Sequence, residues 1–111
     1  MTAASDTLGD RIRPLLARRS GIAEKKMFGG IGFMLNGNML IGTTAKGDLL
    51  VRVDPDRIDE PLTKPGAYRM HMGPKVMTGF IAVDAKGTAD DGALKDWIKY
   101  ALPYVKTLPA K

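Results

Sequence analysis

The chain has 111 residues, the length of one domain, and this leaves no room for two. It contains no cysteine, which excludes disulfides, thiolate nucleophiles and cysteine-based metal sites. The formal net charge is +5, from 17 basic and 12 acidic residues that are scattered along the chain. We therefore expect a single domain over residues 1–111, with its core over about residues 8–106 and a charged, solubilising surface.

The first predicted element is a helix from about Asp6 to Arg19, whose apolar residues recur at i, i+4, i+7 and i+8. Ser5 or Thr7 is its expected N-cap, and Gly21 can end it. Pro14 removes one helical hydrogen bond but lies opposite the apolar stripe. The helix is therefore predicted either to continue through this proline or to break beside it.

The middle of the chain is predicted to form an antiparallel sheet. Asn36-Gly37 is the strongest hairpin signal in the sequence, and a second turn follows at residues 45–48. The strands expected around these turns are about Ala23–Phe28, Ile31–Leu35, Asn38–Thr44 and Leu49–Val53. A paired glycine, Gly29-Gly30, joins the first two strands and indicates a bulge or a tight bend.

The remaining elements are a short helix opened by Asp54-Pro55, two strands at about Tyr68–Met72 and Val76–Val83, and a C-terminal helix. Residues 88–91 resemble a capping box at the start of that helix, and its apolar residues recur at helical spacing through Val105. Together the elements predict an α+β fold. We expect an antiparallel sheet of five or six strands, arranged as a meander of hairpins and flanked by the N-terminal and C-terminal helices.

The residues that catalysis requires are scarce. His71 is the only histidine, and the only serines, Ser5 and Ser20, flank the first helix, so a Ser-His-acid triad is hard to assemble. No ligand spacing for a metal is present, and the glycines do not follow a phosphate-loop pattern. Arg69 and His71 share one side of a predicted strand, as a pocket wall or a solvated face. We predict no catalytic residue, no metal site, no cofactor and no enzymatic activity.

Methionine is frequent in the predicted strands, at positions 27, 34, 39, 70, 72 and 77. Its flexible thioether chain fills gaps in apolar cores and also suits adaptable binding surfaces. Core filling is the expectation for these six residues.

Basic residues and tyrosines flank the apolar stripes of both terminal helices. On the last helix, three lysines line one side of the stripe and two tyrosines line the other, and two arginines share a flank of the first helix. Such stripes either contact phosphates or form a solvated face with snorkelling side chains. We name these residues the candidate interaction surface: Arg11, Arg18, Lys95, Lys99, Tyr100, Tyr104 and Lys106.

The stretch from Lys26 to Leu40 contains a recognisable motif, Met27-Phe28-Gly29-Gly30, followed by a hairpin with a glycine-containing turn. A hydrophobic strand that ends in a basic residue and Asp54 comes next, and residues 68–80 and 94–102 follow in order. This succession resembles the N-terminal domain of the TfoX/Sxy family over about residues 8–106. We interpret the motif itself as structural, because paired glycines permit positive φ and close backbone approach.

The resemblance implies a regulatory function. Full-length members of the family are similar to regulators of natural competence that act in transcription alongside a DNA-binding activator, and they carry a second, C-terminal domain. We expect this chain to be a stand-alone first domain. The leading prediction is a non-catalytic protein-interaction module with a regulatory role in transcription or competence, for which a protein partner is expected.

The alternative is weak, sequence-independent nucleic-acid binding through the basic helix flanks. A homodimer is left open. The apolar runs are far shorter than a membrane span, and the first residues lack the regions of a signal peptide. We therefore expect no membrane association and a cytoplasmic location.

Overall fold

The computed structural model describes residues 3–27 and 29–110, with the backbone alone for residue 72. Its elements follow the chain in this order: α1 (Ala3–Leu16), β1 (Ile22–Met27), β2 (Gly30–Leu35), β3 (Asn38–Thr43), β4 (Leu49–Arg52), η1 (Pro55–Arg57), η2 (Pro61–Thr63), β5 (Ala67–Met72), β6 (Lys75–Val83) and α2 (Asp91–Lys106). The six strands form one antiparallel sheet in the order β1-β2-β3-β4-β6-β5. The predicted α+β fold is confirmed.

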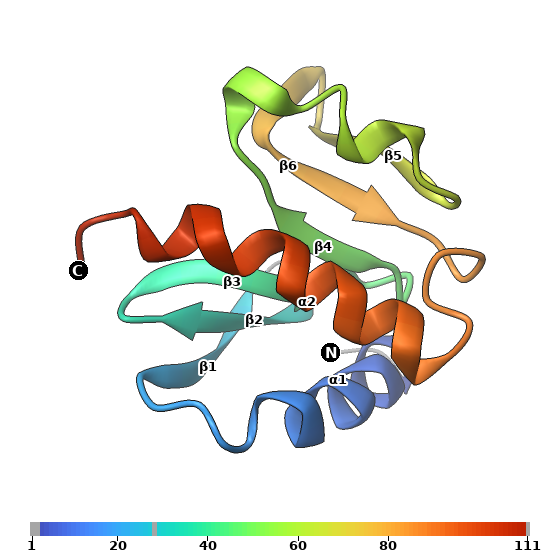
Figure 1. The fold of residues 1–111 in the computed structure, drawn as a ribbon. Coiled ribbons are helices and arrows are strands. Elements are labelled where there is room, and N and C mark those ends of the chain that lie inside the picture. Colours follow the sequence, from blue (N-terminus) through green and yellow to red (C-terminus); the bar gives the residue numbers. More distant parts are fainter. Residues whose placement is uncertain (1–2, 28, 111) are drawn as a thin grey trace.

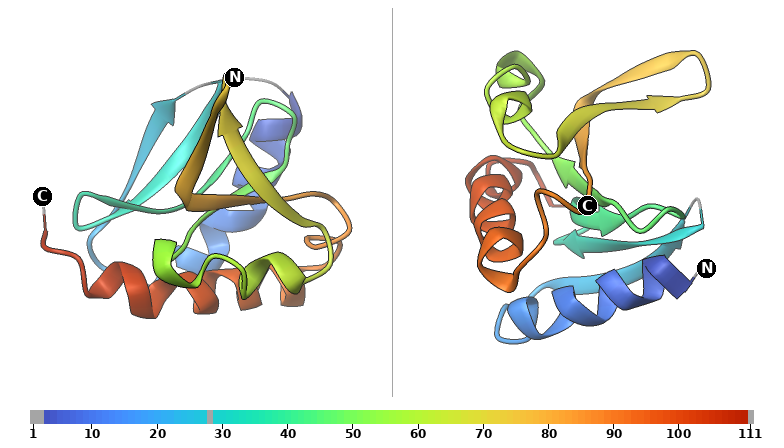
Figure 2. Two further views of the ribbon diagram at one scale, coloured as in Figure 1. Left: turned by 90° about the horizontal axis from the view of Figure 1, so that it is seen from above. Right: turned by 90° about the vertical axis from the view of Figure 1, so that its right-hand side faces the viewer.

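Both helices pack on the same face of this sheet. α1 contacts β2 and β3, and α2 contacts β3 and β4. The β5–β6 hairpin forms the end of the sheet farthest from β1 and extends away from both helices (Figures 1 and 2). The alternate strand residues that face the helices form the core with them. Its fully buried members include Ile12, Phe33, Ile41, Val51 and Leu94. We call the opposite face of the sheet, which no described helix covers, the open face.

The β2–β3 hairpin turns at the predicted dipeptide. Asn36 and Gly37 both have positive φ, 52° and 85°, as a type I′ turn requires. The strands flanking it lie within one or two residues of the predicted bounds. The register shifts between Phe33 and Met34, where the ladder is irregular.

The predicted helix caps are wrong in both helices. α1 begins at Ala3, so Ser5 lies inside the helix, where it is buried and its hydroxyl lies 2.6 Å from that of Thr43. The hydroxyl of Thr7 donates back to the carbonyl of Ala3. In α2 the N-cap is Asp90, whose carboxylate accepts from the backbone N–H of Ala93. The side chains that were expected to cap α1 therefore serve tertiary and local contacts.

Each α-helix tolerates its proline because the residue lies near the C-terminal end of the helix and on its exposed face. α1 continues through Pro14 to Leu16, and α2 continues through Pro103 to Lys106. Both rings are exposed, so the hydrogen bonds they remove are on the solvent side. Continuation, rather than a break, is the arrangement that the structure shows.

The segment between β4 and β5 forms two one-turn 3₁₀ helices instead of one short helix. Asp54 caps η1 by accepting from the N–H of Asp56, and Pro61 begins η2 and is itself buried. This segment lies against the C-terminal half of α2 (Figure 1). Within the described residues, neither α-helix has the length and apolar character needed to cross a bilayer.

Candidate interaction surface

The glycines of the family motif are explained by the backbone around them. The chain reverses between β1 and β2 at Gly29, whose φ of 77° is rarely adopted by residues that carry a side chain. A Cβ on Gly30 would lie 1.9 Å from the carbonyl oxygen of Thr43, so only glycine fits there. Met27 is half-buried on the open face. Phe28 lies outside the described residues.

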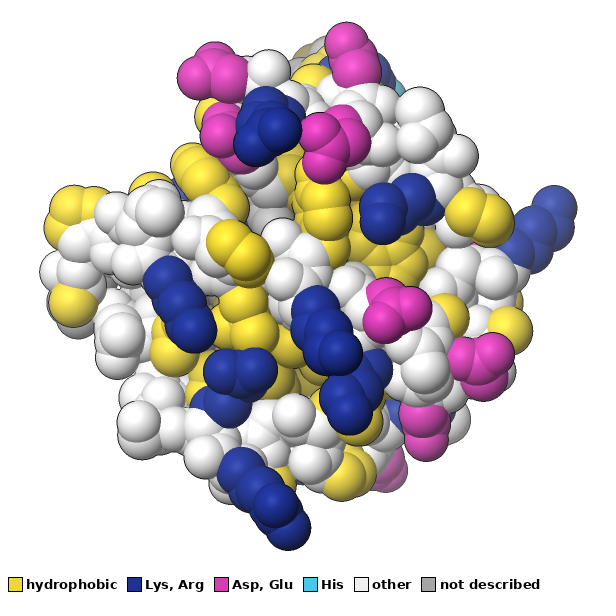
Figure 3. Space-filling model, viewed as in Figure 1, with side chains coloured by type: hydrophobic (Ala, Val, Ile, Leu, Met, Phe, Trp, Pro, Cys, Tyr) yellow, Lys and Arg dark blue, Asp and Glu magenta, His cyan; other side chains and the backbone are white. Residues whose placement is uncertain are grey.

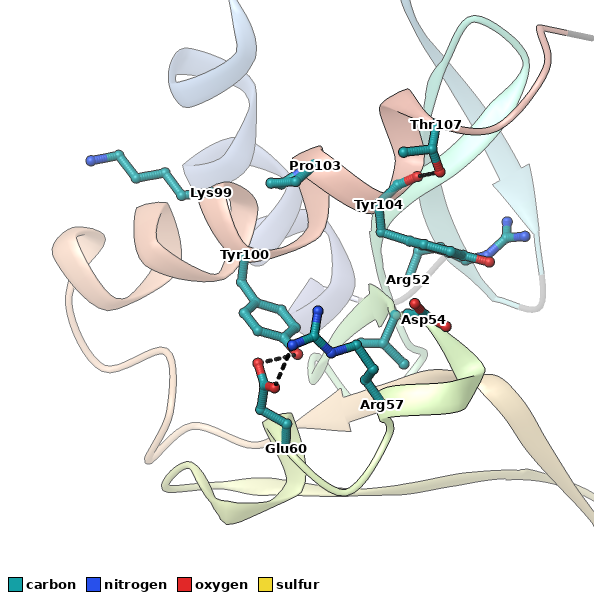
Figure 4. A pocket seen from close by; sticks show the side chains of 10 residues that line it. Arg52, Asp54, Arg57, Glu60, Lys99, Tyr100, Pro103, Tyr104 and Thr107 are labelled. Carbon is teal, nitrogen blue, oxygen red and sulfur yellow. Dashed lines mark hydrogen bonds and ion pairs between the residues drawn. The ribbon is translucent and has the colours of Figure 1, made fainter.

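A groove of about 570 Å³ runs between α2 and the η1–η2 segment (Figure 4). We call it the α2 groove. Its walls come from three parts of the chain: the end of β4, the connection from residue 53 through η1 to Glu60, and one side of α2 with the residue that follows it. The residues that line it are Arg52, Val53, Asp54, Arg57, Glu60, Lys99, Tyr100, Pro103, Tyr104 and Thr107.

Glu60 organises one end of this groove. Its carboxylate accepts a 3.2 Å hydrogen bond from the hydroxyl of Tyr100 and lies 3.6 Å from the guanidinium of Arg57. Figure 4 shows these three side chains converging from η1, from the residue before η2, and from α2. Burial raises the pKa of Tyr100, and the charge of Glu60 raises it further. The phenol therefore stays protonated and acts as a donor at neutral pH.

Trp97 and Lys64 pack against the ring of Tyr100. Trp97 packs edge-on against Tyr100 with their centroids 6.0 Å apart. The ammonium of Lys64 lies over both rings, 5.0 Å from the centroid of Tyr100 and 5.5 Å from that of Trp97. These contacts hold Tyr100 in place from the side away from the groove, so its ring is a fixed part of the wall.

The structure brings together three residues of the candidate interaction surface. Lys99, Tyr100 and Tyr104 line the α2 groove, with Lys99 extending outward from its rim (Figure 4). Lys95 and Lys106 are exposed on the same helix, and no ion pair among the described residues involves either of them or Lys99. In Figure 3, basic side chains gather over α2 and the strands below it, and acidic ones gather above and at the N-terminal end of α2.

The two arginines of α1 are placed elsewhere. Arg11 contacts Asp91 at 3.2 Å and donates to the carbonyl of Thr88 at 2.8 Å, so it ties α1 to the start of α2. Arg18 is exposed just beyond the C-terminal end of α1. Neither lines the α2 groove.

Sequence reasoning missed Arg52, Arg57 and Glu60 as parts of this groove. Arg52 was visible only as the polar residue of an otherwise apolar strand, and Arg57 and Glu60 only as charges in a proline-rich connection. Their position opposite α2 depends on how the connection folds back, which the local pattern does not indicate.

A second groove, of about 300 Å³, lies on the open face and is almost entirely apolar. We call it the methionine groove, and it is lined by Met27, Met39, Thr43, Thr44, Leu50, Met70, Met77 and Phe80. The expected core filling is wrong for Met27, Met70 and Met77, which stay half-buried in this groove. Met39 is buried, at 8% exposure, on the same side.

His71 and Arg69 do not form a pocket wall in this structure. Both are exposed on β5, and Arg69 pairs with Asp59 at 3.2 Å. Over the described ranges, no three histidine, aspartate or glutamate side chains are grouped closely enough to hold a metal ion.

Comparisons with known proteins place the chain in a family. Neither curated proteins nor solved structures give a significant match. Comparison with protein families matches the TfoX N-terminal domain over residues 14–104, which is most of the chain and includes the glycine motif, the whole sheet and α2 up to Tyr104. The chain therefore belongs to the TfoX N-terminal domain family.

Proposed function

We propose that this protein is a non-catalytic interaction module of regulatory type, which binds a protein partner in the cytoplasm through the α2 groove. The observation that carries the proposal is the composition of that groove: two tyrosines and a proline flanked by Arg52, Arg57 and Lys99. Tyrosine and arginine are the residues that dominate binding energy in protein interfaces. Family membership supports a regulatory role, of the kind found in control of competence.

The chemistry of the groove favours binding over catalysis. The hydroxyl of Tyr100 donates to Glu60, and that of Thr107 donates to the carbonyl of Tyr104. Neither hydroxyl is paired with a histidine, which is the usual general base for activating a nucleophile. Tyr100 is held by its contacts with Trp97, Lys64 and Glu60, so little of its side-chain entropy is lost when a partner covers it.

A comparative affinity capture tests this proposal. Tagged wild-type protein, Arg57→Glu and Arg19→Glu are used to capture proteins from nuclease-treated lysate of the source cell, followed by quantitative mass spectrometry. Arg19 is a matched control, because it is an exposed arginine beyond α1 and outside the groove. We expect a partner retained by the wild type and by Arg19→Glu but lost with Arg57→Glu. Equal recovery by all three variants, with folding verified by circular dichroism, would contradict the proposal.

A second candidate function is weak nucleic-acid binding through α2. Lys95, Lys99 and Lys106 are exposed on one helix and take part in none of the ion pairs among the described residues. Contacts of this kind reach phosphates rather than base edges, so binding is expected to be independent of sequence. Dissociation constants of about 10⁻⁴–10⁻⁶ M at physiological salt follow for such contacts.

Fluorescence anisotropy with random-sequence duplex DNA at several salt concentrations checks this candidate. Three phosphate contacts predict a log–log salt slope of about −3. The double variant Lys95→Glu/Lys106→Glu is expected to abolish most binding without altering the α2 groove, which neither residue lines. Nanomolar binding that discriminates between sequences would contradict this weak, non-specific mode.

A further inference from the structure

The methionine groove is built into the sheet by two facing glycines. Gly32 on β2 pairs with Gly42 on β3, and both face the open side. A Cβ on Gly32 would lie 3.0 Å from the Cε of Met27, and one on Gly42 would lie 2.6 Å from the Cε of Met39. The two methionine side chains therefore extend over bare backbone, and the absence of side chains at these positions leaves a hollow beside them.

The backbone under the groove restricts what can occupy it. Its lining residues belong mainly to strands β3, β4 and β6, each of which is already paired on both sides. A peptide strand laid across this face would find no free N–H or C=O partners for its own backbone. A helix satisfies its backbone internally and needs only an apolar stripe to pack on a sheet. The geometry therefore favours a helix as the occupant.

The charges around the groove favour an acidic occupant. Lys25 faces the open side opposite Gly32, Arg52 lies 5.1 Å over the ring of Phe80, and exposed lysines lie close in the chain to groove residues, at positions 46 and 75. None of these four cations takes part in an ion pair among the described residues. Asp48 accepts from the hydroxyl of Tyr68 and Asp84 accepts from the N–H of Lys86, and both carboxylates keep their charge. The four cations outnumber these two carboxylates.

We propose that the methionine groove docks an amphipathic helix of a partner protein whose apolar stripe is flanked by acidic residues. The methionines adapt to the apolar side chains of this helix, as flexible thioethers do at binding surfaces. The lysines and Arg52 around the groove pair with the acidic flanks. The methionine groove borders the α2 groove at Arg52, which lines the α2 groove and lies over Phe80, but the two grooves share no lining residue. The inference therefore goes beyond the function proposed above.

Other occupants fit the structure less well. A second copy of this chain cannot supply the helix, because the apolar stripes of α1 and α2 are buried in its own core. The exposed face of α2 carries Lys95, Lys99 and Lys106. Those lysines would meet like charges at the groove. A fatty acid has a single carboxylate, whereas Lys25 on β1 and Arg52 on β4 lie three strand spacings apart, about 14 Å along the sheet. Charges spread in this way match a helix that carries several acidic residues.

A peptide-binding experiment tests the proposal. The probe is a fluorescein-labelled synthetic helix of about 18 residues, long enough to hold helical structure, with leucines on one stripe and glutamates beside it. A second peptide has lysine in place of every glutamate. Binding of each to the full chain is measured by fluorescence anisotropy, with dodecanoate added as a competitor. Sedimentation of the protein alone reports on its oligomeric state.

Two pairs of matched variants locate the binding site. Met77→Glu places a charge in the groove, and Thr78→Glu places the same charge at the exposed next residue outside its lining. Lys25→Glu reverses a charge on the open face, and Lys26→Glu does so one residue along β1, on the face toward α1. Thermal melts of all four variants establish that they are folded before they are compared.

The proposal predicts that the acidic helix binds and that the basic helix does not. Met77→Glu should weaken binding of the acidic helix by about tenfold or more, Lys25→Glu by several-fold, and neither control should change it. Four results would overturn the proposal. They are no binding of the acidic peptide, equal binding of both peptides, release of the bound acidic peptide by dodecanoate at a concentration below that at which the peptide binds, or a dimer of the protein that Met77→Glu dissociates.

Discussion

Trp97 is the largest side chain that joins α2 to the rest of the protein. It is 5% exposed, its indole N–H donates to the carbonyl of Gly87 at 3.2 Å, and its ring supports Tyr100 in the wall of the α2 groove. The residue therefore links the stability of the core to the shape of the groove. A change at this position should affect both.

Replacing Trp97 with alanine should lower the free energy of unfolding by roughly 3–5 kcal/mol, because a large buried ring is lost and a cavity remains. Trp97→Phe keeps an aromatic ring and removes the hydrogen bond to Gly87, so its effect should be smaller. Urea denaturation followed by circular dichroism measures both. A midpoint that does not move in Trp97→Ala would show that the ring does not contribute as its burial implies.

The two glycines under the methionine groove should respond differently to alanine. At Gly42 an added Cβ would lie 2.7 Å from the backbone oxygen of Ile31, which cannot move without disturbing β2, so a cost of about 1–3 kcal/mol is expected. At Gly32 the closest atom is the flexible end of Met27, at 3.0 Å. Gly32→Ala should therefore be nearly neutral in a urea melt, and an equal cost for both substitutions would contradict this account.

An ion pair between Arg13 and Glu24 links α1 to the edge strand β1. The guanidinium of Arg13 donates to both carboxylate oxygens of Glu24, at 2.8 and 2.9 Å. The hydrogen bond from Arg13 lowers the pKa of Glu24 below the usual glutamate value of 4.5, although partial burial opposes this. Both side chains are 42% exposed, so solvent screens the pair and limits its contribution.

The sign of the pKa shift fixes how this contribution depends on pH. A carboxylate whose pKa is lowered by folding stabilises the folded state above pH 4.5, and this stabilisation disappears as the pH falls through the lowered pKa. Glu24→Gln should therefore cost less than about 1 kcal/mol at pH 7, and the difference from the wild type should fade below pH 4.5. Urea melts at pH 7 and pH 3 check this, and a difference that grows toward acid would be the wrong sign.

Elements were predictable from the sequence where local chemistry determines them. The Asn36-Gly37 turn and the apolar stripe of α2 each depend on neighbouring residues alone, and both appear in the structure. The role of Ser5 was not predictable in this way, because its hydroxyl is hydrogen-bonded to that of Thr43 on β3, which is distant in the sequence. A tertiary hydrogen bond overrode a local preference there.

α1 and α2 cover only one face of the sheet. In the strand Leu49–Val53 the sequence places Leu49, Val51 and Val53 on one face and Leu50 and Arg52 on the other, which predicts that one face is more polar. The structure buries one side under α1 and α2 and leaves the methionine groove on the other. Periodicity marked one face of this strand as more polar, but it could not show that methionines from other strands form an apolar groove on that face.

The α2 groove likewise depends on long-range folding. Tyr100 and Tyr104 were identifiable from their spacing on a helix, but Arg52, Arg57 and Glu60 join them only because the segment after β4 folds back along α2. The groove and its charges are thus properties of the assembled domain.

Site-specific photocrosslinking in the source cell tests whether the α2 groove binds a protein partner. A benzophenone amino acid replaces Lys99 at the rim of the α2 groove in one variant and Lys26, exposed on β1, in another. The account predicts a discrete protein adduct from position 99 on irradiation and none from position 26. No adduct from position 99, or the same adducts from both positions, would contradict the assignment of the α2 groove as the partner-binding surface.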